Sequence, residues 1–208
     1  MEENISYKSE IYRKLFHLGM LILPISYFFL TKKQLLSFLL PIAAVFIALD
    51  YSRQRFPEAR IIINKLFGKI YRDHESNGEF SGASYVAIAA CITFVFFSKV
   101  IAINAFTILA ISDALASLVG RRIPSQPFFE KSFAGASAFF ISALLILIFY
   151  GIIFKENFPY YLFGICAVFA TTVIESRPSL LKLDDNLSVP LTFSIVMFLF
   201  DLLWVYQY

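Results

Sequence analysis

Apolar residues occur along this chain in long blocks rather than in alternating or helical stripes. Short segments that carry most of the charged residues separate the blocks. A helix needs about 20 residues, with about 17 as the lower limit, to cross a hydrocarbon layer of about 30 Å. The pattern therefore predicts seven membrane-spanning helices, at residues 15–30, 35–51, 82–98, 100–119, 133–154, 158–176 and 188–206.

The composition agrees with a membrane protein. Of the 208 residues, 59% are hydrophobic and 16% are charged, whereas a soluble domain carries about 25% charged residues. Cys91 and Cys166 lie inside apolar blocks, at a spacing that indicates neither a disulfide framework nor a zinc site. The first block lacks a small-residue cleavage site, so we interpret it as a retained anchor rather than a signal peptide. We expect an all-α polytopic integral membrane protein, with one transmembrane domain over residues 1–208.

The basic residues predict the orientation of these spans. If there are seven spans, fourteen lysines and arginines lie on the side of the N-terminus and four on the other side. Because cytoplasmic loops carry the excess of basic residues, the N-terminus is expected in the cytoplasm and the C-terminus outside. The four residues on the outer side are Lys32, Lys33, Lys99 and Lys155.

Asp113 is the most unusual residue in this arrangement. It lies inside an apolar span that runs inward, about seven residues, or about 10 Å, before the cytoplasmic end at Gly120. An ionised carboxylate near the centre of a membrane helix costs at least about 2–3 kcal/mol and tends to mark a functional site.

Other polar groups gather on the same predicted face of the membrane. Taken singly, each has an ordinary interpretation, as a boundary carboxylate, a cation that reaches the headgroups or a buried core histidine. Together they bring carboxylates and basic side chains to one face of the membrane, as a site for a metal ion and phosphate requires. They are Arg13, Lys14, His17, Asp50, Arg121, Arg122, Lys131, Glu175, Asp184 and Asp185.

Two spans begin with small residues around a glycine. Phe80-Ser-Gly82-Ala-Ser opens the third span and Phe133-Ala-Gly135-Ala-Ser opens the fifth. Small residues at a helix N-terminus allow an anion to approach free backbone N–H groups. They equally allow two helices to pack closely, so both interpretations stay open.

Several of these stretches resemble the motifs of one enzyme family. Asp113-Ala-Leu-Ala-Ser-Leu-Val-Gly-Arg-Arg122, Lys131-Ser132-Phe-Ala-Gly135-Ala-Ser, Glu175 and Asp184-Asp-Asn186-Leu-Ser-Val-Pro are similar to the signature of the dolichol kinase, phytol kinase and CTP-dependent diacylglycerol kinase family. Arg13-Lys14-Leu-Phe-His17 is similar to the opening motif of that family. The motifs occur in the family's order and cover nearly the whole chain. This family is related to the phosphatidate cytidylyltransferases.

The resemblance implies a CTP-dependent kinase that phosphorylates the hydroxyl of a membrane lipid alcohol, such as phytol, a polyprenol, dolichol or diacylglycerol. Mg²⁺ takes carboxylate and phosphate oxygens as ligands, so we expect Asp113, Asp184 and Asp185 to hold it. The basic residues suit phosphate, and the general base is Glu175 or Asp50, which the sequence leaves open. The expected catalytic residues are Asp113, Glu175, Asp50 and His17. The expected nucleotide and phosphate ligands are Arg13, Lys14, Arg121, Arg122, Lys131, Ser132, Gly135 and Asn186.

Two other functions stay open at this point. A cytidylyltransferase would use the same nucleotide site but release pyrophosphate and form a CDP-lipid. A transporter is disfavoured, because its ionisable residues should lie near the membrane midplane. The expected partners are CTP, the lipid alcohol and the membrane, and nucleic acid is not expected; the oligomeric state is left open. We expect the bacterial cytoplasmic membrane, rather than the endoplasmic reticulum or a plastid, with the site facing the cytoplasm.

Overall fold

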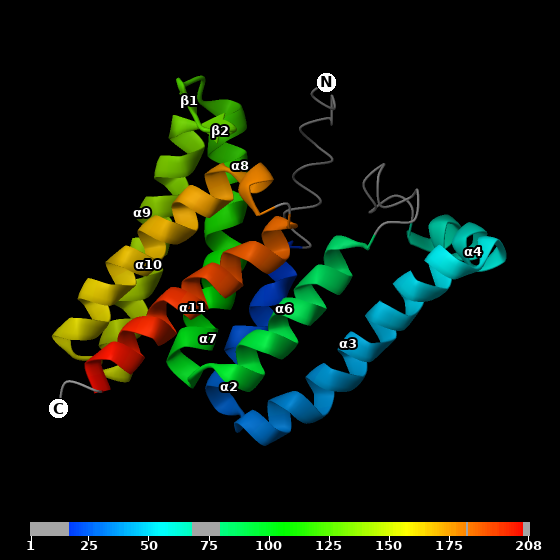
Figure 1. The fold of residues 1–208 in the computed structure, drawn as a ribbon, viewed down its shortest axis with the longest axis horizontal. Helices are drawn as coiled ribbons and strands as arrows, with labels where there is room; N and C mark the ends of the chain where they lie inside the picture. Colours follow the sequence, from blue (N-terminus) through cyan, green and yellow to red (C-terminus); the bar gives the residue numbers. More distant parts are fainter. Residues whose placement is uncertain (1–16, 68–79, 182, 206–208) are drawn as a thin grey trace.

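A computed structural model describes residues 17–67, 80–181 and 183–205, and nearly all of them are helical (Figure 1). A 3₁₀ turn, η1 (Gly19–Leu21), leads into α2 (Ile22–Phe29), followed by α3 (Lys32–Arg55) and α4 (Pro57–Phe67). After the first gap come α6 (Gly82–Phe96), α7 (Lys99–Thr107), the π-helical turn η2 (Ile108–Ser112) and α8 (Asp113–Arg122). The chain ends with α9 (Phe133–Phe154), α10 (Phe158–Ser176), the 3₁₀ turn η3 (Pro178–Leu180) and α11 (Asp185–Val205).

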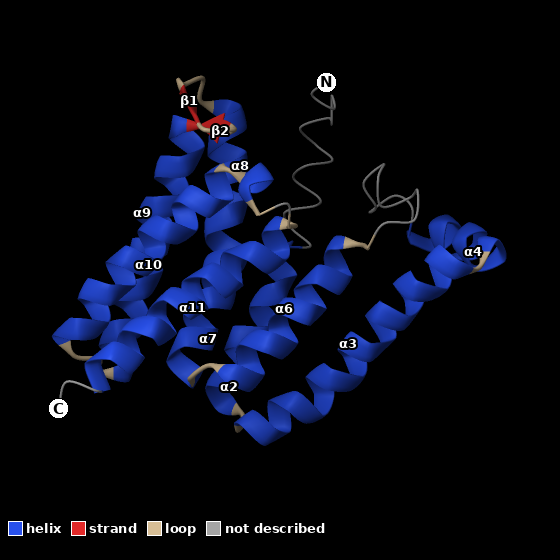
Figure 2. Cartoon of the chain, in the orientation of Figure 1, coloured by secondary structure: helices blue, strands red, loops and turns tan. Residues whose placement is uncertain are grey.

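The described strands form a single short hairpin between α8 and α9. β1 (Pro127–Phe128) pairs antiparallel with β2 (Lys131–Ser132), and Figure 2 shows the two red arrows above the helical body. The rest of the described chain confirms the predicted all-α class.

An apolar helix lies at each of the seven predicted positions, but the helices differ in length. Four are long and apolar enough to cross a membrane: Lys32–Arg55, Lys99–Arg122, Phe133–Phe154 and Phe158–Ser176. The other three apolar stretches are shorter, at Gly19–Phe29, Gly82–Phe96 and Asp185–Leu199. The predicted second span, at 35–51, is extended at both ends in α3, and α4 was not predicted.

Short polar side chains define where most of these helices begin. The side chain of Thr31 accepts from the backbone of Gln34 in a capping box, and Ser81, Ser98, Ser132 and Asn157 cap α6, α7, α9 and α10 in the same manner. Each cap satisfies a backbone N–H that the first helical turn leaves without a partner. These caps therefore define the first residues of α3, α6, α7, α9 and α10.

The continuous run α7–η2–α8 forms the centre of the bundle. Its side chains from Ile101 to Ala110 are almost fully buried, and it packs against α2, α6, α9 and α11. Inside the bundle, Asn104 Nδ2 donates to Tyr160 Oη over 2.9 Å, and this bond ties the central helix to α10. The outward faces of α3, α9 and α10 instead expose large apolar side chains such as Phe38, Leu145 and Phe169. A polar interior contact within an apolar exterior suits a bundle surrounded by lipid.

Close packing joins α8 to α9. A Cβ added at Gly135 would lie 2.9 Å from the Ala116 carbonyl oxygen and 3.3 Å from the Gly120 Cα. Both neighbours are backbone atoms, so neither can move aside without shifting a helix. The backbone N–H of Gly135 already donates to Ser132 Oγ over 3.2 Å. The packing interpretation of this glycine therefore has direct structural support.

A substitution of Gly135 tests this packing. We expect Gly135→Ala to force α8 and α9 apart and to cost about 1–3 kcal/mol, as overpacking usually does. Gly19→Ala is the matched control, because a Cβ there meets nothing within 4 Å. Thermal unfolding in one detergent should show a lower melting temperature for the first variant alone. Equal melting temperatures would contradict the close approach of the two helices.

Candidate active site

The polar residues predicted from the sequence are distributed between two buried clusters. The main cluster contains Asp113, His17, Lys131, Glu175, Asp185 and Asn186, and a second cluster surrounds Asp50. The main cluster lies toward the end of the bundle where the hairpin, the end of α8 and the start of α11 meet (Figure 1).

Asp113 is placed by an irregularity in the central helix. The π-helical turn η2 ends at Ser112, so Asp113 is the first residue of α8. π-helical turns within α-helices are rare and are frequently found at functional sites. Asp113 is only 5% exposed, so its carboxylate lies deep in the bundle.

His17 connects Asp113 to α11. Its Nδ1 lies 3.4 Å from Asp113 Oδ2, and its Nε2 lies 2.8 Å from Asn186 Oδ1. The imidazole is buried, and a protonated ring would satisfy both oxygens at once. The predicted residues His17, Asp113 and Asn186 are thus in direct contact, although they are far apart in the sequence.

Lys131 joins the hairpin to α10 and α11. Its Nζ donates to Glu175 Oε1 over 2.6 Å and to Asp185 Oδ2 over 3.2 Å. The Glu175 side chain is 1% exposed and that of Lys131 is 29% exposed. A fully buried carboxylate that contacts a partly accessible lysine is suited to a site that opens on one side.

The electrostatics link Lys131 to Asp113 as well. Burial on its own would lower the pKa of Lys131, but the negative charges of Asp185, Glu175 and Asp113 more than compensate and raise it above its ordinary value. Lys131 therefore stays protonated throughout the physiological pH range. Lys131 and the carboxylates of Asp113, Glu175 and Asp185 therefore form a single electrostatic unit.

Within the described residues, no three His, Cys, Asp or Glu side chains lie close enough together to hold a metal ion. Mg²⁺ is usually held by one or two carboxylates together with substrate phosphate oxygens, and Asp113 and Asp185 supply two carboxylates beside Lys131. Asp185 Oδ1 is buried and has no hydrogen-bond partner in the described part of the chain. Asp184 is engaged differently, since its Oδ1 accepts from the backbone N–H of Asn186 over 2.9 Å at the start of α11.

Asp50 lies in the second cluster, with its oxygens already bonded. Its Oδ2 accepts from the backbone N–H and the hydroxyl of Ser81, both at 2.7 Å, and its Oδ1 pairs with Arg53 Nη2 at 2.9 Å. Arg53 is fully buried, and its role was not predicted from the sequence. This cluster holds the end of α3 against the start of α6, as a structural ion pair would.

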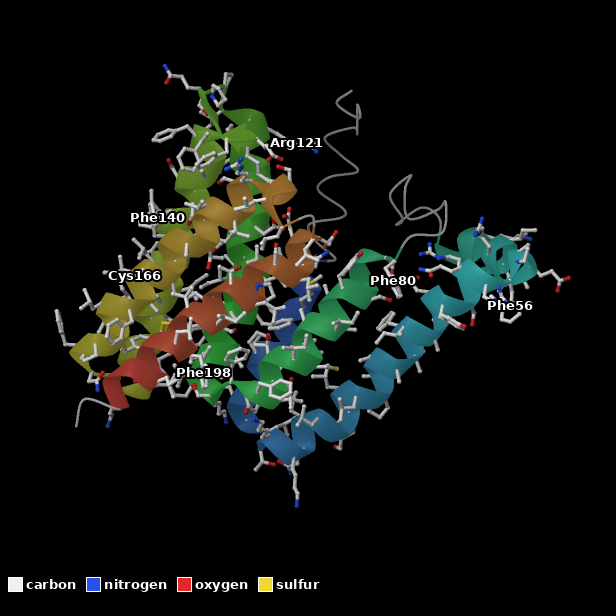
Figure 3. All side chains as sticks on the ribbon, viewed as in Figure 1. Phe56, Phe80, Arg121, Phe140, Cys166 and Phe198 are labelled. Carbon is white, nitrogen blue, oxygen red and sulfur yellow. The ribbon has the colours of Figure 1, made fainter. Side chains whose placement is uncertain are left out.

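The remaining predicted residues lie at the same end of the molecule or outside the described part. Arg121 and Arg122 are exposed at the end of α8, and Figure 3 shows Arg121 beside the hairpin. Ser132 caps α9 and also donates to the Gly120 carbonyl over 3.4 Å. Arg13 and Lys14 lie outside the described residues.

The sequence reasoning did not identify Glu130 and Ser179. The side chain of Glu130 accepts from the backbone N–H and the hydroxyl of Ser179, which ties the hairpin to the turn after α10. The position of Glu130 directly before Lys131 was the available signal, but it gave no information on its partner.

Comparison with known proteins identifies relatives in a bacterium and an archaeon. "Uncharacterized protein RP860" of Rickettsia prowazekii (strain Madrid E) is 35% identical over 185 residues, which cover 88% of this chain and 90% of that protein. "Uncharacterized protein MJ1137" of Methanocaldococcus jannaschii is 29% identical over 191 residues, which cover 90% of this chain and 92% of that protein. No protein-family model and no solved structure matches the chain. The similarity extends over nearly the whole length of both relatives, so it concerns the entire helical body.

Removal of the Asp50 charge tests the structural interpretation of the second cluster. We expect Asp50→Ala to leave a fully buried arginine without its carboxylate and to destabilise the fold by about 3–5 kcal/mol. The free energy of unfolding in detergent should fall by that amount, whereas Glu58→Ala, at an exposed carboxylate on α4, should change it by less than about 0.5 kcal/mol. A stable Asp50→Ala protein would contradict this interpretation.

Proposed function

We propose that this chain, which belongs to the family of the uncharacterized protein RP860 of Rickettsia prowazekii, is a membrane-embedded kinase that transfers the γ-phosphate of CTP to the hydroxyl of a lipid alcohol. The single observation that carries the proposal is the contact of Lys131 with Glu175 and Asp185 beside Asp113. These residues come from separate stretches that resemble the motifs of the dolichol, phytol and diacylglycerol kinases. Lys131 and Asp185, which belong to two of these stretches and are 54 positions apart in the sequence, are in direct contact, and this contact supports the proposal.

The proposed orientation places this cluster on the cytoplasmic side. We propose seven crossings, with the N-terminus in the cytoplasm and the C-terminus outside, in the bacterial cytoplasmic membrane. Eight of the twelve described lysines and arginines lie at the ends of α3, α8 and α10, on α4 and in the hairpin, all on the predicted cytoplasmic side, and this asymmetry supports the assignment. The three connections between α2 and α3, α6 and α7, and α9 and α10 carry the other four. Nucleotide reaches an integral membrane enzyme from the cytoplasm, so this orientation gives the cluster access to its substrate.

Asp113 and Asp185 are the residues that would hold Mg²⁺, with Asp184 next to them. The ion would neutralise charge on the triphosphate. The buried and unpartnered oxygen of Asp185 supports this assignment, because an additional cation would satisfy it.

Lys131 would act as the point charge on the transferred phosphate. It lies in the cluster, remains protonated and is 29% exposed, so an anion can approach its Nζ. Arg121 and Arg122 are exposed at the end of α8 and would contact the outer phosphates through their planar forks. Arg13, Lys14, Ser132 and Asn186 remain proposed ligands, whereas Gly135 serves in helix packing.

Glu175 is the better candidate for the general base. It lies in the same cluster as Lys131 and Asp185, where its Oε1 accepts from Lys131 and its Oε2 from the Ser176 hydroxyl, whereas Asp50 lies in the other cluster with Arg53 and Ser81. In the proposed reaction the lipid hydroxyl gives its proton to Glu175, and its oxygen attacks the γ-phosphorus. CDP leaves, and the phosphate monoester of the lipid remains. Such transfers depend mainly on alignment and on neutralisation of charge.

The decisive experiment uses CTP labelled at the γ-phosphate. Purified protein in mixed micelles should transfer the label to one lipid of a panel of phytol, polyprenols and diacylglycerol, with CDP as the co-product. If label appears in pyrophosphate and the lipid carries CDP, the cytidylyltransferase alternative is correct. If no lipid acquires label with any nucleotide, the kinase proposal is wrong.

Asp113→Asn provides the matched variant for this assay. The amide keeps the size of the side chain but removes its charge, so the rate should fall by about a hundredfold to a thousandfold. The neutral side chain is easier to bury, so the melting temperature should hold or rise. Asp201→Asn, at an exposed carboxylate near the C-terminal end of α11, is the control and should retain the parent rate. A folded Asp113→Asn protein with the parent rate would remove Asp113 from the site.

A further inference from the structure

The hairpin between α8 and α9 is too small to hold its own shape. Each strand has two residues, and an isolated two-stranded hairpin is at best marginally stable in water. Its turn contains Phe129 with a φ of 55°, in the left-handed region that aromatic residues seldom adopt. Such a conformation persists only where the surroundings impose it. The contacts that surround the turn therefore determine where the hairpin lies.

Those contacts come from the end of α10 and the turn that follows. The backbone N–H of Glu130 donates to the Ser176 carbonyl over 3.0 Å. The Glu130 carboxylate accepts from the Ser179 backbone N–H at 3.3 Å and also from the Ser179 hydroxyl. The Arg177 guanidinium lies 5.8 Å from the centre of the Phe129 ring, within the range of a cation–π contact.

These contacts run in a fixed register into the candidate site. Phe129 meets Arg177, Glu130 meets Ser176 and Ser179, and Lys131 meets Glu175. A shift of one residue in the hairpin would move the Lys131 Cα by about 3.3 Å and point its side chain to the opposite face. The Glu130–Ser179 contact is the most specific of these interactions, since one carboxylate receives two donors from a single residue.

We propose that Glu130 is a positioning residue, and that its contact with Ser179 holds Lys131 against Glu175. The effect of Glu130 on catalysis rests on the proposed function, whereas its effect on the position of Lys131 does not depend on that function. Both Glu130 and Ser179 are exposed and lie outside the packed bundle, so the fold does not depend on them. Lysine loses considerable rotamer freedom when it is held in one place. The Glu130–Ser179 contact, called the clamp below, restricts that freedom of Lys131 before substrate binds.

Kinetics of three variants test the catalytic part. Glu130→Ala removes both hydrogen bonds to Ser179 and should lower kcat about tenfold, because misplacement of a charged group by about 1 Å can cost up to a hundredfold. Ser179→Ala removes only the hydroxyl bond, since its backbone N–H still donates to Glu130, and should lower kcat by less. Glu130→Gln can keep both contacts, because its amide oxygen accepts from the Ser179 backbone N–H while its amide N–H donates to the Ser179 hydroxyl oxygen, so it should restore kcat to within about twofold of the parent. The melting temperatures of all three should remain close to that of the parent. A Glu130→Gln protein as slow as Glu130→Ala would overturn the clamp, because the negative charge of Glu130, rather than its contact with Ser179, would then be required for kcat.

Chemical modification tests the position of Lys131 without any activity. The parent protein and the three variants are treated briefly with a water-soluble acetylating reagent, and acetylation of Lys131 is measured by mass spectrometry relative to the exposed Lys155 at the other end of the bundle. We expect acetylation of Lys131 to rise severalfold in Glu130→Ala, to rise by a smaller factor in Ser179→Ala, which keeps the backbone bond, and to stay at the parent level in Glu130→Gln. Unchanged acetylation in the alanine variants would overturn the proposal. If acetylation changes as expected while the parent protein phosphorylates no lipid, the clamp stands and only the proposed function fails.

Discussion

The cost of burying charge in an apolar bundle governs the arrangement of this protein. Asp113, Glu175 and Asp185 lie at one end of the helical body, and Lys131 is the cation that contacts two of them directly. Uncompensated carboxylates in such surroundings cost several kcal/mol, so α8, α10, α11 and the hairpin are held in positions that allow this compensation. The π-helical turn, the helix caps and the close contact of Gly135 with Gly120 all serve to bring these segments together.

The two buried clusters differ in how their carboxylate oxygens are bonded. Asp50 contacts Arg53 and two donors of Ser81, so its charge is matched and its oxygens are occupied. The main cluster retains a buried oxygen on Asp185 without a partner among the described residues and has more carboxylates than lysines. A buried carboxylate oxygen without a partner, beside a partly accessible lysine, is suited to a cation and a phosphate.

Much of this site followed from the sequence because its signals are local. The long apolar blocks and the side on which basic residues fall predicted that Asp113, Lys131, Glu175 and Asp185 lie near one another. The resemblance to a lipid kinase family selected the same residues. Their meeting in the bundle agrees with this prediction, while the reaction itself remains a proposal.

Other features depend on contacts between distant residues, which one sequence does not reveal. Asp50 and Glu175 were equivalent as candidate bases, because both end an apolar span; the structure separates them because Asp50 contacts Arg53 and Ser81, whereas Glu175 contacts Lys131. The two interpretations of Gly135 differ only through the position of Gly120 on another helix. The helix α4 was missed because it is short and carries both charged and apolar residues, and the Glu130–Ser179 contact joins residues that are 49 positions apart.

The central claim is that the Lys131 cluster binds a divalent cation together with a nucleoside triphosphate. Mn²⁺ prefers the same oxygen ligands as Mg²⁺ and is paramagnetic, so electron–nuclear double resonance can detect phosphorus nuclei near it. We expect purified protein with Mn²⁺ and CTP to give an immobilised Mn²⁺ signal with phosphorus couplings, and Lys131→Ala to weaken the binding of that complex. Absence of protein-bound Mn²⁺ at saturating nucleotide, or binding that is the same in Lys131→Ala, would contradict the account.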